Sequence, residues 1–285
     1  MSMILLIVMN IAIMIVANIA MSIMQSMGII SMDSQSVSNL MVFFALIGFG
    51  GAYLSLFMSK MLVKRSMGVR VIDTPNNSLE HWYVNEVHAQ CYKANLPIPE
   101  IGIFEGSPNA FATGATKSSS LVAISTGLLN GMQKNEISAV IAHELSHINN
   151  GDMATMTLLQ GLVNTFVMLF SHLIGRAIDR VIFKSNRDGI GYFAGRFIAQ
   201  MLLTVVASII LMAYSRWREY RADAGGARLA GKQNMIGALQ ALQNSHTKPL
   251  PDEERAFGIV GFTSELFLTH PPLSKRIAKL REQQF

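Results

Sequence analysis

Two histidines and a glutamate stand together in the order His143-Glu144-Leu145-Ser146-His147. On a helix, residues four apart lie on one face about one turn apart, so both imidazoles can bind one tetrahedral zinc ion. Glu144 adjoins the first ligand and can reach a metal-bound water without ligating the metal. A chain with seven His and eleven Glu in 285 residues is expected to hold only about 0.007 such patterns by chance. The motif therefore predicts zinc-dependent hydrolysis with Glu144 as general base, rather than two histidines merely packed on an amphipathic helix.

A catalytic zinc ion also needs a third protein ligand and an open position for water. Glu219 and Asp223 are one helical turn apart, so one carboxylate can bind the metal while the other accepts the free ring N–H of a zinc-bound histidine. On their own, these acids would be typical of a surface helix paired with neighbouring arginines. Because the metal needs a third ligand, we predict Glu219 as that ligand and Asp223 as the residue that orients a histidine. The other downstream residues able to bind zinc are His172, His246, Glu265 and His270.

The composition indicates a membrane protein. Apolar residues make up 51% of the chain and charged residues 14%, against about 25% charged in a typical globular protein. Such a chain cannot keep all its apolar surface out of water, so lipid must cover part of it. A disordered, collagenous or disulfide-stapled protein is excluded, and the single cysteine, Cys91, fits a reducing compartment. The net charge of +5 comes from cations beside hydrophobic segments, which favours anionic lipid over nucleic acid as their partner.

Four uncharged stretches are long enough to be membrane segments: residues 4–24, 40–58, 153–175 and 197–215. The first two predict a hairpin with both ends in the cytoplasm, because a group of cations follows the second stretch at once. These cations are Lys60, Lys64, Arg65 and Arg70.

The third and fourth stretches leave two interpretations open. The third contains several polar side chains, among them Thr165, Ser171 and His172. The loop between the two stretches carries more basic than acidic residues, which opposes its transfer across the membrane. Either the pair forms a hairpin despite these charges, or it packs in or on the membrane without crossing it fully.

A more polar region lies between the second and third stretches and has the pattern of a water-soluble fold. Its apolar periodicity predicts helices at about 77–94 and 134–149. Three short runs bounded by turn residues predict strands at 101–104, 110–113 and 121–125. We expect these strands to form a short antiparallel sheet.

Segments 109–114, 143–152, 219–225 and 269–276 together resemble, in order and spacing, the membrane-bound HtpX protease family. The resemblance implies a bacterial inner-membrane zinc endopeptidase, multi-pass, with a cytoplasmic active site and one Zn²⁺ per chain. It implies polypeptide substrates, in particular misfolded or damaged membrane proteins, and a distant relation to the CaaX prenyl proteases. The Glu-x-x-x-Asp element is similar to that of thermolysin-like zincins, which supports Glu219 as ligand. Arg221, a cation close to these carboxylates, would weaken metal binding if it paired with Glu219.

The fold class predicted in this way is a mainly α membrane protein with a small α+β zincin-like catalytic domain. Residues 1–63 are expected to form an N-terminal transmembrane hairpin and 64–152 the first part of the metalloprotease domain, with the histidine motif. Residues 153–215 are expected to form a second hydrophobic helical pair, and 216–285 the remainder of the metalloprotease domain, with the third ligand.

The mechanism that follows uses zinc held by His143, His147 and Glu219, which brings the pKa of a bound water toward about 7. Glu144 takes the proton as water attacks the peptide carbonyl, and then delivers it to the leaving amine.

Two further elements of the site are expected from the resemblance. The segment Asn109, Ala110, Phe111 and Ala112 resembles the family's edge strand, which pairs with an extended substrate; an ordinary internal strand is an equal alternative. His270 is a candidate to stabilise the oxyanion. A helix that simply begins near His270 is the plainer interpretation of that histidine.

Two other functions remain alternatives. An intramembrane-cleaving protease would hold the motif at membrane depth, but Lys134, Glu136 and Asp152 flank the helix and favour a position in or near water. A non-catalytic zinc-binding membrane scaffold would normally close its metal site with a fourth protein ligand. The presence of Glu144 beside the first histidine disfavours a non-catalytic scaffold. The oligomeric state and the physiological substrates are left open.

Overall fold

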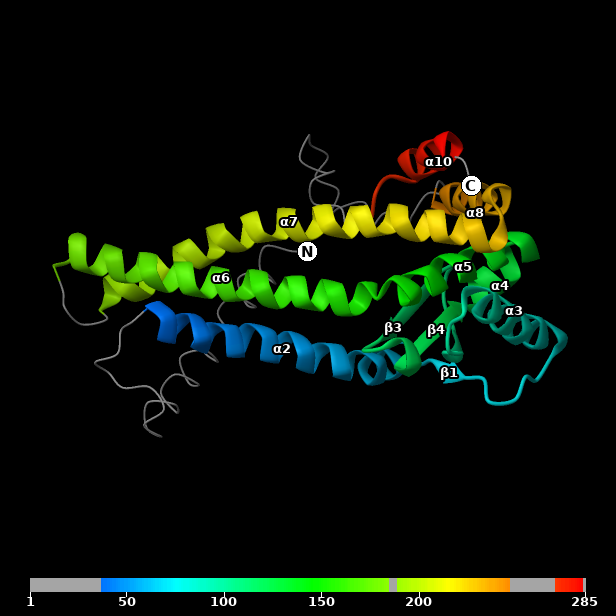
Figure 1. The fold of residues 1–285 in the computed structure, drawn as a ribbon, viewed down its shortest axis with the longest axis horizontal. Coiled ribbons are helices and arrows are strands. Elements are labelled where there is room, and N and C mark those ends of the chain that lie inside the picture. The colour runs from blue at the N-terminus through cyan, green and yellow to red at the C-terminus, as the bar shows by residue number, and fades with distance from the viewer. Residues whose placement is uncertain (1–36, 185–188, 247–269, 284–285) are drawn as a thin grey trace. The chain divides into compact units, whose positions relative to one another are not determined.

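The computed structural model describes residues 37–184, 189–246 and 270–283. Within these ranges the chain is mainly helical and contains one small sheet (Figure 1). The first predicted membrane segment, residues 4–24, lies outside them, whereas the second segment of the predicted N-terminal hairpin, residues 40–58, is described. In chain order the elements are α2 (Val37–Ser66), β1 (Arg70–Val71), α3 (Ser78–Ala94), β2 (Glu100–Phe104), β3 (Ala110–Gly114), η1 (Lys117–Ser119), β4 (Ser120–Ser125), α4 (Thr126–Gly131), α5 (Lys134–Asn150), α6 (Asp152–Val181), α7 (Ile190–Ala230), α8 (Lys232–His246) and α10 (Leu273–Glu282).

Three helices are long and apolar enough to cross a membrane. They are Leu40–Ser66, Asp152–Val181 and Ile190–Ala230, with mean hydropathies of 2.1, 1.5 and 2.2. Large apolar side chains on them are exposed, for example Leu54 at 62% and Leu202 at 65%, and an exposed apolar surface of this kind requires lipid. The prediction of a mainly α membrane protein is confirmed.

The chain divides into two compact units, and helices α2, α6 and α7 each have residues in both units. The first unit contains residues up to Leu54 together with Thr157–Leu211, and the second contains Ser55–Met156 and Met212–Phe285. The four-part division into residues 1–63, 64–152, 153–215 and 216–285 stays a prediction.

In the first unit, α6 turns its polar side chains inward. Thr165, Ser171 and His172 are 3% exposed or less. The hydroxyl groups of Thr165 and Ser171 donate to carbonyls of their own helix. His172 Nδ1 lies 2.8 Å from the Tyr192 hydroxyl of α7. Each of these three polar side chains therefore has a partner within the protein, which suits a helix in lipid.

The sheet of the second unit has the order β1-β2-β4-β3. β3 pairs with β4 antiparallel, but β2 pairs with β4 in parallel. The prediction of an antiparallel sheet is therefore wrong for the pairing of β2 with β4, and the sheet is mixed. The reason is topological: the chain reverses twice between β2 and β4, and β4 inserts between β2 and β3. β3 is left at the edge of the sheet, and its outer side has no strand partner among the described residues.

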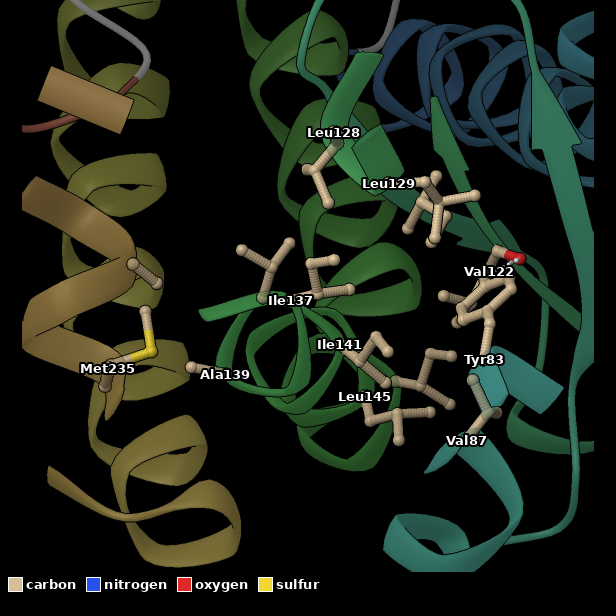
Figure 2. Close-up of a cluster of buried hydrophobic side chains, with 14 of the residues drawn as sticks. Tyr83, Val87, Val122, Leu128, Leu129, Ile137, Ala139, Ile141, Leu145 and Met235 are labelled. Atoms are coloured by element: carbon tan, nitrogen blue, oxygen red, sulfur yellow. Dashed lines mark hydrogen bonds between the residues drawn. The ribbon is translucent and has the colours of Figure 1, made fainter. Parts of the chain in front are cut away.

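Helix α5 is the centre of the second unit's core. Ile137, Ile141 and Leu145 are at most 1% exposed, and Figure 2 shows Ile141 and Leu145 pointing toward α3, where Tyr83 and Val87 lie. The opposite side of α5 faces Met235 of α8 (Figure 2). Each such apolar side chain contributes about 1.5–3 kcal/mol by burial. The helix that carries the histidine motif is therefore held rigidly between two packed layers.

The two predicted helices of this region and its three predicted strands are present, with ends displaced by at most one residue. The two-residue strand β1 and the single-turn elements η1 and α4 were not predicted. α4 begins where the Ser125 hydroxyl accepts the Leu128 N–H at 3.1 Å. At the end of α5, Gly151 adopts a φ of 67°, a left-handed conformation that suits glycine and ends the helix.

Candidate active site

The two histidines of α5 lie side by side in the buried interior. His143 is 7% exposed and His147 is 8% exposed, and their Nε2 atoms are 3.2 Å apart. Glu144, the residue after His143, is half-buried and lines the adjoining cleft. The helical spacing of the motif thus gives the common face that the sequence predicts.

Glu219 of α7 completes a three-residue cluster. Its Oε2 lies 3.5 Å from His143 Nε2, and its Oε1 lies 3.3 Å from His147 Nε2. A tetrahedral zinc ion with bonds of about 2.05 Å separates its ligand atoms by about 3.3 Å. One ligand atom from each of the three residues lies within 4.8 Å of the other two, so the cluster could hold such an ion, with the shortest Glu219 distances reached by different carboxylate oxygens. Glu219 is 1% exposed and its Oε1 has no hydrogen-bond partner, so the donor set is suited to a cation. Among the described residues this is the one cluster of its kind.

Two glycines let α7 approach α5 closely enough for this contact. A Cβ atom at Gly225 would lie 2.4 Å from Ser146 Oγ, and one at Gly226 would lie 3.2 Å from the His143 backbone nitrogen. Contacts shorter than about 3 Å would force the helices apart. Gly225 follows Glu219 by six residues on the same helix, so the spacing of the three-residue cluster depends on it.

Asp223 and Arg276 form a buried ion pair beside His143. Asp223 Oδ1 lies 3.0 Å from His143 Nδ1. Arg276 of α10 donates to both carboxylate oxygens of Asp223, at 2.6 and 2.8 Å. The carboxylate can therefore fix the orientation of the imidazole. The sequence predicts Asp223 beside a histidine, whereas the role of Arg276, the last residue of the 269–276 segment, was not predicted.

Asp152 contacts His147 in the way that Asp223 contacts His143, through the ring Nδ1 atom. Its Oδ2 lies 2.7 Å from His147 Nδ1, and the side chain is 0% exposed. Gly151 ends α5 in a left-handed conformation and α6 begins at the next residue, which places Asp152 against the histidine five residues earlier. This residue was also missed as part of the site. An acid placed directly after a helix-ending glycine was the available signal.

These carboxylates raise the pKa of both histidines. Burial alone would lower the pKa of His143, but hydrogen bonds with Asp223 and Glu219 outweigh it and raise the pKa to about 9. Burial also opposes protonation of His147, and its contacts with Asp152 and Glu219 raise the pKa overall. The carboxylates favour positive charge at this point, and either a proton or a metal cation can supply it.

The site opens into a cleft of about 470 Å³. One wall contains Asn109 and Ala110, at the start of the edge strand β3. Asn109 is fixed against β4, because its N–H donates to Ser125 Oγ and its carbonyl accepts the Ser125 N–H, both at 2.9 Å. Phe111 and Ala112 continue the edge strand and are half-buried, but they do not line the cleft.

His270 also reaches the cluster. Its side chain is 61% exposed, and its Nδ1 lies 2.9 Å from Glu219 Oε2. Arg221 does not reach the cluster. Its guanidinium lies over the Trp217 ring, 4.7 Å from the ring centroid, and donates a hydrogen bond to Asn150 Oδ1 at 3.3 Å. The condition under which Arg221 would weaken metal binding, an ion pair with Glu219, is therefore not met in this structure. The arginines that face Glu219 are Arg276, whose Nη1 lies 3.5 Å from Oε2, and Arg218, whose Nε lies 4.0 Å from Oε1.

A family model described as Peptidase family M48 matches residues 77–284, which include every residue of this cluster. The chain belongs to peptidase family M48. The Protease HtpX of Pseudoalteromonas atlantica is 49% identical over 257 residues, which cover 89% of this chain and 88% of that relative. The Protease HtpX homolog of Thiobacillus denitrificans is 47% identical over 288 residues, 99% of each chain. The crystal structure of S. mikatae Ste24p matches with a TM-score of 0.63 at 19% identity, over 93% of this chain and 67% of that one.

M48 membership confirms the predicted family and makes the chain a metalloprotease with polypeptide substrates. Because the chain also has three helices long and apolar enough to cross a membrane, it is a membrane metalloprotease. The buried cluster of two histidines and Glu219 could hold the metal ion of such an enzyme. The likeness to Ste24p supports the fold of the M48 chain, not its substrate.

Proposed function

We propose that this M48 membrane metalloprotease is a zinc endopeptidase of the bacterial inner membrane, which cleaves misfolded or damaged membrane proteins from the cytoplasmic side. The observation that carries the proposal is the buried His143, His147 and Glu219 cluster with Glu144 beside it, open to a cleft. Two imidazole nitrogens and a carboxylate are ligands that zinc prefers, and three protein ligands leave a position for water.

When bound, zinc would supply a Lewis acid and lower the pKa of water at the open position. Glu144, which lines the cleft without belonging to the cluster, receives the proton as water attacks the peptide carbonyl. It then delivers the proton to the leaving amine. Asp223 and Asp152 hold the two imidazoles by their Nδ1 atoms, so that each presents Nε2 to the metal.

The substrate is proposed to bind along the edge strand. Asn109, Ala110, Phe111 and Ala112 belong to or adjoin β3, whose outer side has no strand partner among the described residues. An extended peptide can add to such an edge through backbone hydrogen bonds. His270 lies on the solvent side of Glu219 and is proposed to stabilise the oxyanion of the tetrahedral intermediate.

The orientation in the membrane is supported by the cations at the end of α2. Lys60 and Lys64 both pair with Glu100 of β2, the first at 2.6 Å. All three residues belong to the second unit, which also contains the metal cluster. The cation-rich end of a membrane helix faces the cytoplasm, so the cluster is proposed to face it too. This also disfavours the intramembrane-cleaving alternative.

The proposal is tested with detergent-purified protein that is treated with chelator, supplied with zinc and incubated with an unfolded polypeptide. We expect the wild type to cut internal bonds, Glu144→Gln to bind zinc without cutting, and Glu219→Ala to lose zinc. Glu282→Gln, an exposed position on α10, is the matched control and should cut normally. Equal zinc binding by all variants with no cleavage by any would favour the non-catalytic scaffold instead.

The quality-control role needs its own measurement. Cells that carry the wild type or Glu144→Gln can be compared for the lifetime of a membrane protein that has been damaged by truncation. A longer lifetime in the Glu144→Gln cells is the expected result, and an equal lifetime of every membrane protein followed would contradict that role.

A further inference from the structure

The last part of the edge strand β3 touches the membrane helix α2. Ser59 Oγ of α2 lies 3.1 Å from Thr113 Oγ1 of β3, and Figure 1 shows β3 beside the last turns of α2. Ser59 directly precedes Lys60, the first of the cations that follow the apolar stretch of this helix. Cations at the end of a membrane helix lie at the boundary between lipid and water. Thr113 therefore lies close to the level at which α2 leaves the lipid.

The first part of β3 reaches the metal cluster. Asn109 and Ala110 line the same cleft as His143 and Glu144. Between Ala110 and Thr113 the strand advances by three residues, which is about 10 Å at 3.3 Å per residue. All these residues belong to the second unit. One short strand thus joins the membrane boundary to the site.

The free edge of β3 offers backbone groups between these two points. The Ser125 N–H donates to the Asn109 carbonyl, and Ala110 pairs with Ile124 of β4. Because hydrogen-bonded and open positions alternate along an antiparallel strand, the N–H and carbonyl groups of Ala110 and Ala112 point away from β4. An extended peptide can form hydrogen bonds with these groups.

The free edge of β3 also lies on an exposed side of α2. Lys60 and Lys64 both pair with Glu100 of β2. At about 100° per residue, these lysines lie about 100° and 140° around the helix from Ser59, which contacts β3. In the order β2-β4-β3 the free edge lies beyond β3, and therefore around the helix in the opposite sense from the lysines. Leu62 lies on that side, about 60° from Ser59, and it is 50% exposed.

Resting on the peptidase function proposed above, we infer that a membrane-anchored polypeptide binds along β3, from the lipid beside α2 to the metal cluster. The residues between the membrane and the scissile bond must then cover the path from Thr113 to Ala110. Three residues span this path, and one or two more are needed to leave the lipid, so the enzyme selects bonds about five residues from the membrane. Its substrate class is the juxtamembrane segment of a membrane polypeptide.

The test uses the zinc-loaded full-length enzyme in lipid vesicles. Each synthetic substrate has one apolar membrane-spanning helix, a Gly-Ser spacer and one cleavable sequence taken from a digest of an unfolded protein. The spacer places the scissile bond about 2, 5 or 20 residues from the span, within the range that separates a taut from a flexible connection. The span precedes the cleavable sequence in one series and follows it in the other, because a strand edge can pair in either direction.

The expected rates follow from the reach of the spacer. Two extended residues reach about 7 Å, less than the path along β3, so this substrate should be cut about tenfold more slowly than the five-residue one, or not at all. A flexible spacer of about 20 residues lowers the effective concentration of the bond as the −3/2 power of length, which makes its cleavage about eightfold slower. The same peptides without a span should be cut at equal rates.

Leu62→Trp tests the path itself, because the larger side chain fills the exposed side of α2 next to the edge of β3. It should slow cleavage of the five-residue anchored substrate relative to the same peptide without a span. Met61→Trp is the matched control. Met61 is 46% exposed but lies about 200° around the helix from Ser59, so its substitution should leave this ratio unchanged. Zinc content, measured for each variant, identifies one that has failed to fold.

The inference is overturned if cleavage in both series is independent of spacer length, or if the longest spacer gives the fastest cleavage. A ratio that Leu62→Trp leaves unchanged overturns it as well. Cleavage of the peptides without a span reports the peptidase function separately. If the wild type cuts none of these peptides, the peptidase function itself fails, and this inference fails with it.

Discussion

Asp152→Asn is the substitution that most sharply tests how the histidines are held. The side chain keeps its size but loses its charge at a fully buried position 2.7 Å from His147 Nδ1. A hydrogen bond to a charged group contributes about 1.5–3 kcal/mol, which corresponds to roughly tenfold to hundredfold in binding. Losses of this size are typical of carboxylates that orient metal-binding histidines. We therefore expect zinc to bind about ten to a hundred times more weakly.

The assay is competition for zinc against a chelator of known affinity, with activity measured at saturating zinc. Asp73→Asn, which makes the same change at an exposed position, should bind zinc like the wild type. Asp152 is also the first residue of α6, where a carboxylate favours the helix by about 0.3–1 kcal/mol. Thermal unfolding of the zinc-free proteins measures that separate effect. Zinc affinity within twofold of the wild type would refute the orienting role of Asp152.

Three further predictions concern the same centre. Gly225→Ala should destabilise the protein by about 1–3 kcal/mol and weaken zinc binding, because its methyl group would meet Ser146; Gly131→Ala, where nothing lies within 4 Å, is the control in chemical unfolding. Arg276→Ala breaks a buried ion pair and should cost about 3–5 kcal/mol, whereas Arg281→Ala, exposed on the same helix, should leave the melting temperature nearly unchanged. The proton on His143, whose pKa is raised to about 9, competes with zinc, so apparent zinc affinity should fall about tenfold per pH unit as the pH decreases below 9; a pH-independent affinity between pH 6 and 8 would contradict this.

The parts of the site that depend on local spacing could be predicted from the sequence. The two histidines follow from one helical turn, and Glu219 with Asp223 from another. The family motifs connected these two turns, although 72 residues separate His147 from Glu219. The short strands were also local signals, since turn residues bound each run.

The features that escaped prediction depend on contacts between distant segments. Nothing in the separate strands indicates that β4 inserts between β2 and β3 and makes one pairing parallel. Arg276 lies 53 residues from Asp223, and a lone arginine in a basic helix is typical of a solvated face. Asp152 was predicted only as a polar flank of the helix, because its contact with His147 depends on the left-handed conformation of Gly151.

The most direct test of the metal centre is X-ray absorption at the zinc edge on the detergent-purified, zinc-loaded protein. We predict only nitrogen and oxygen ligands at about 2.0–2.2 Å, including two imidazoles, and loss of bound zinc in Glu219→Ala. A zinc–sulfur distance of about 2.3 Å, which would implicate Cys91, or an unchanged spectrum at full zinc content in Glu219→Ala, would contradict a centre built from His143, His147 and Glu219.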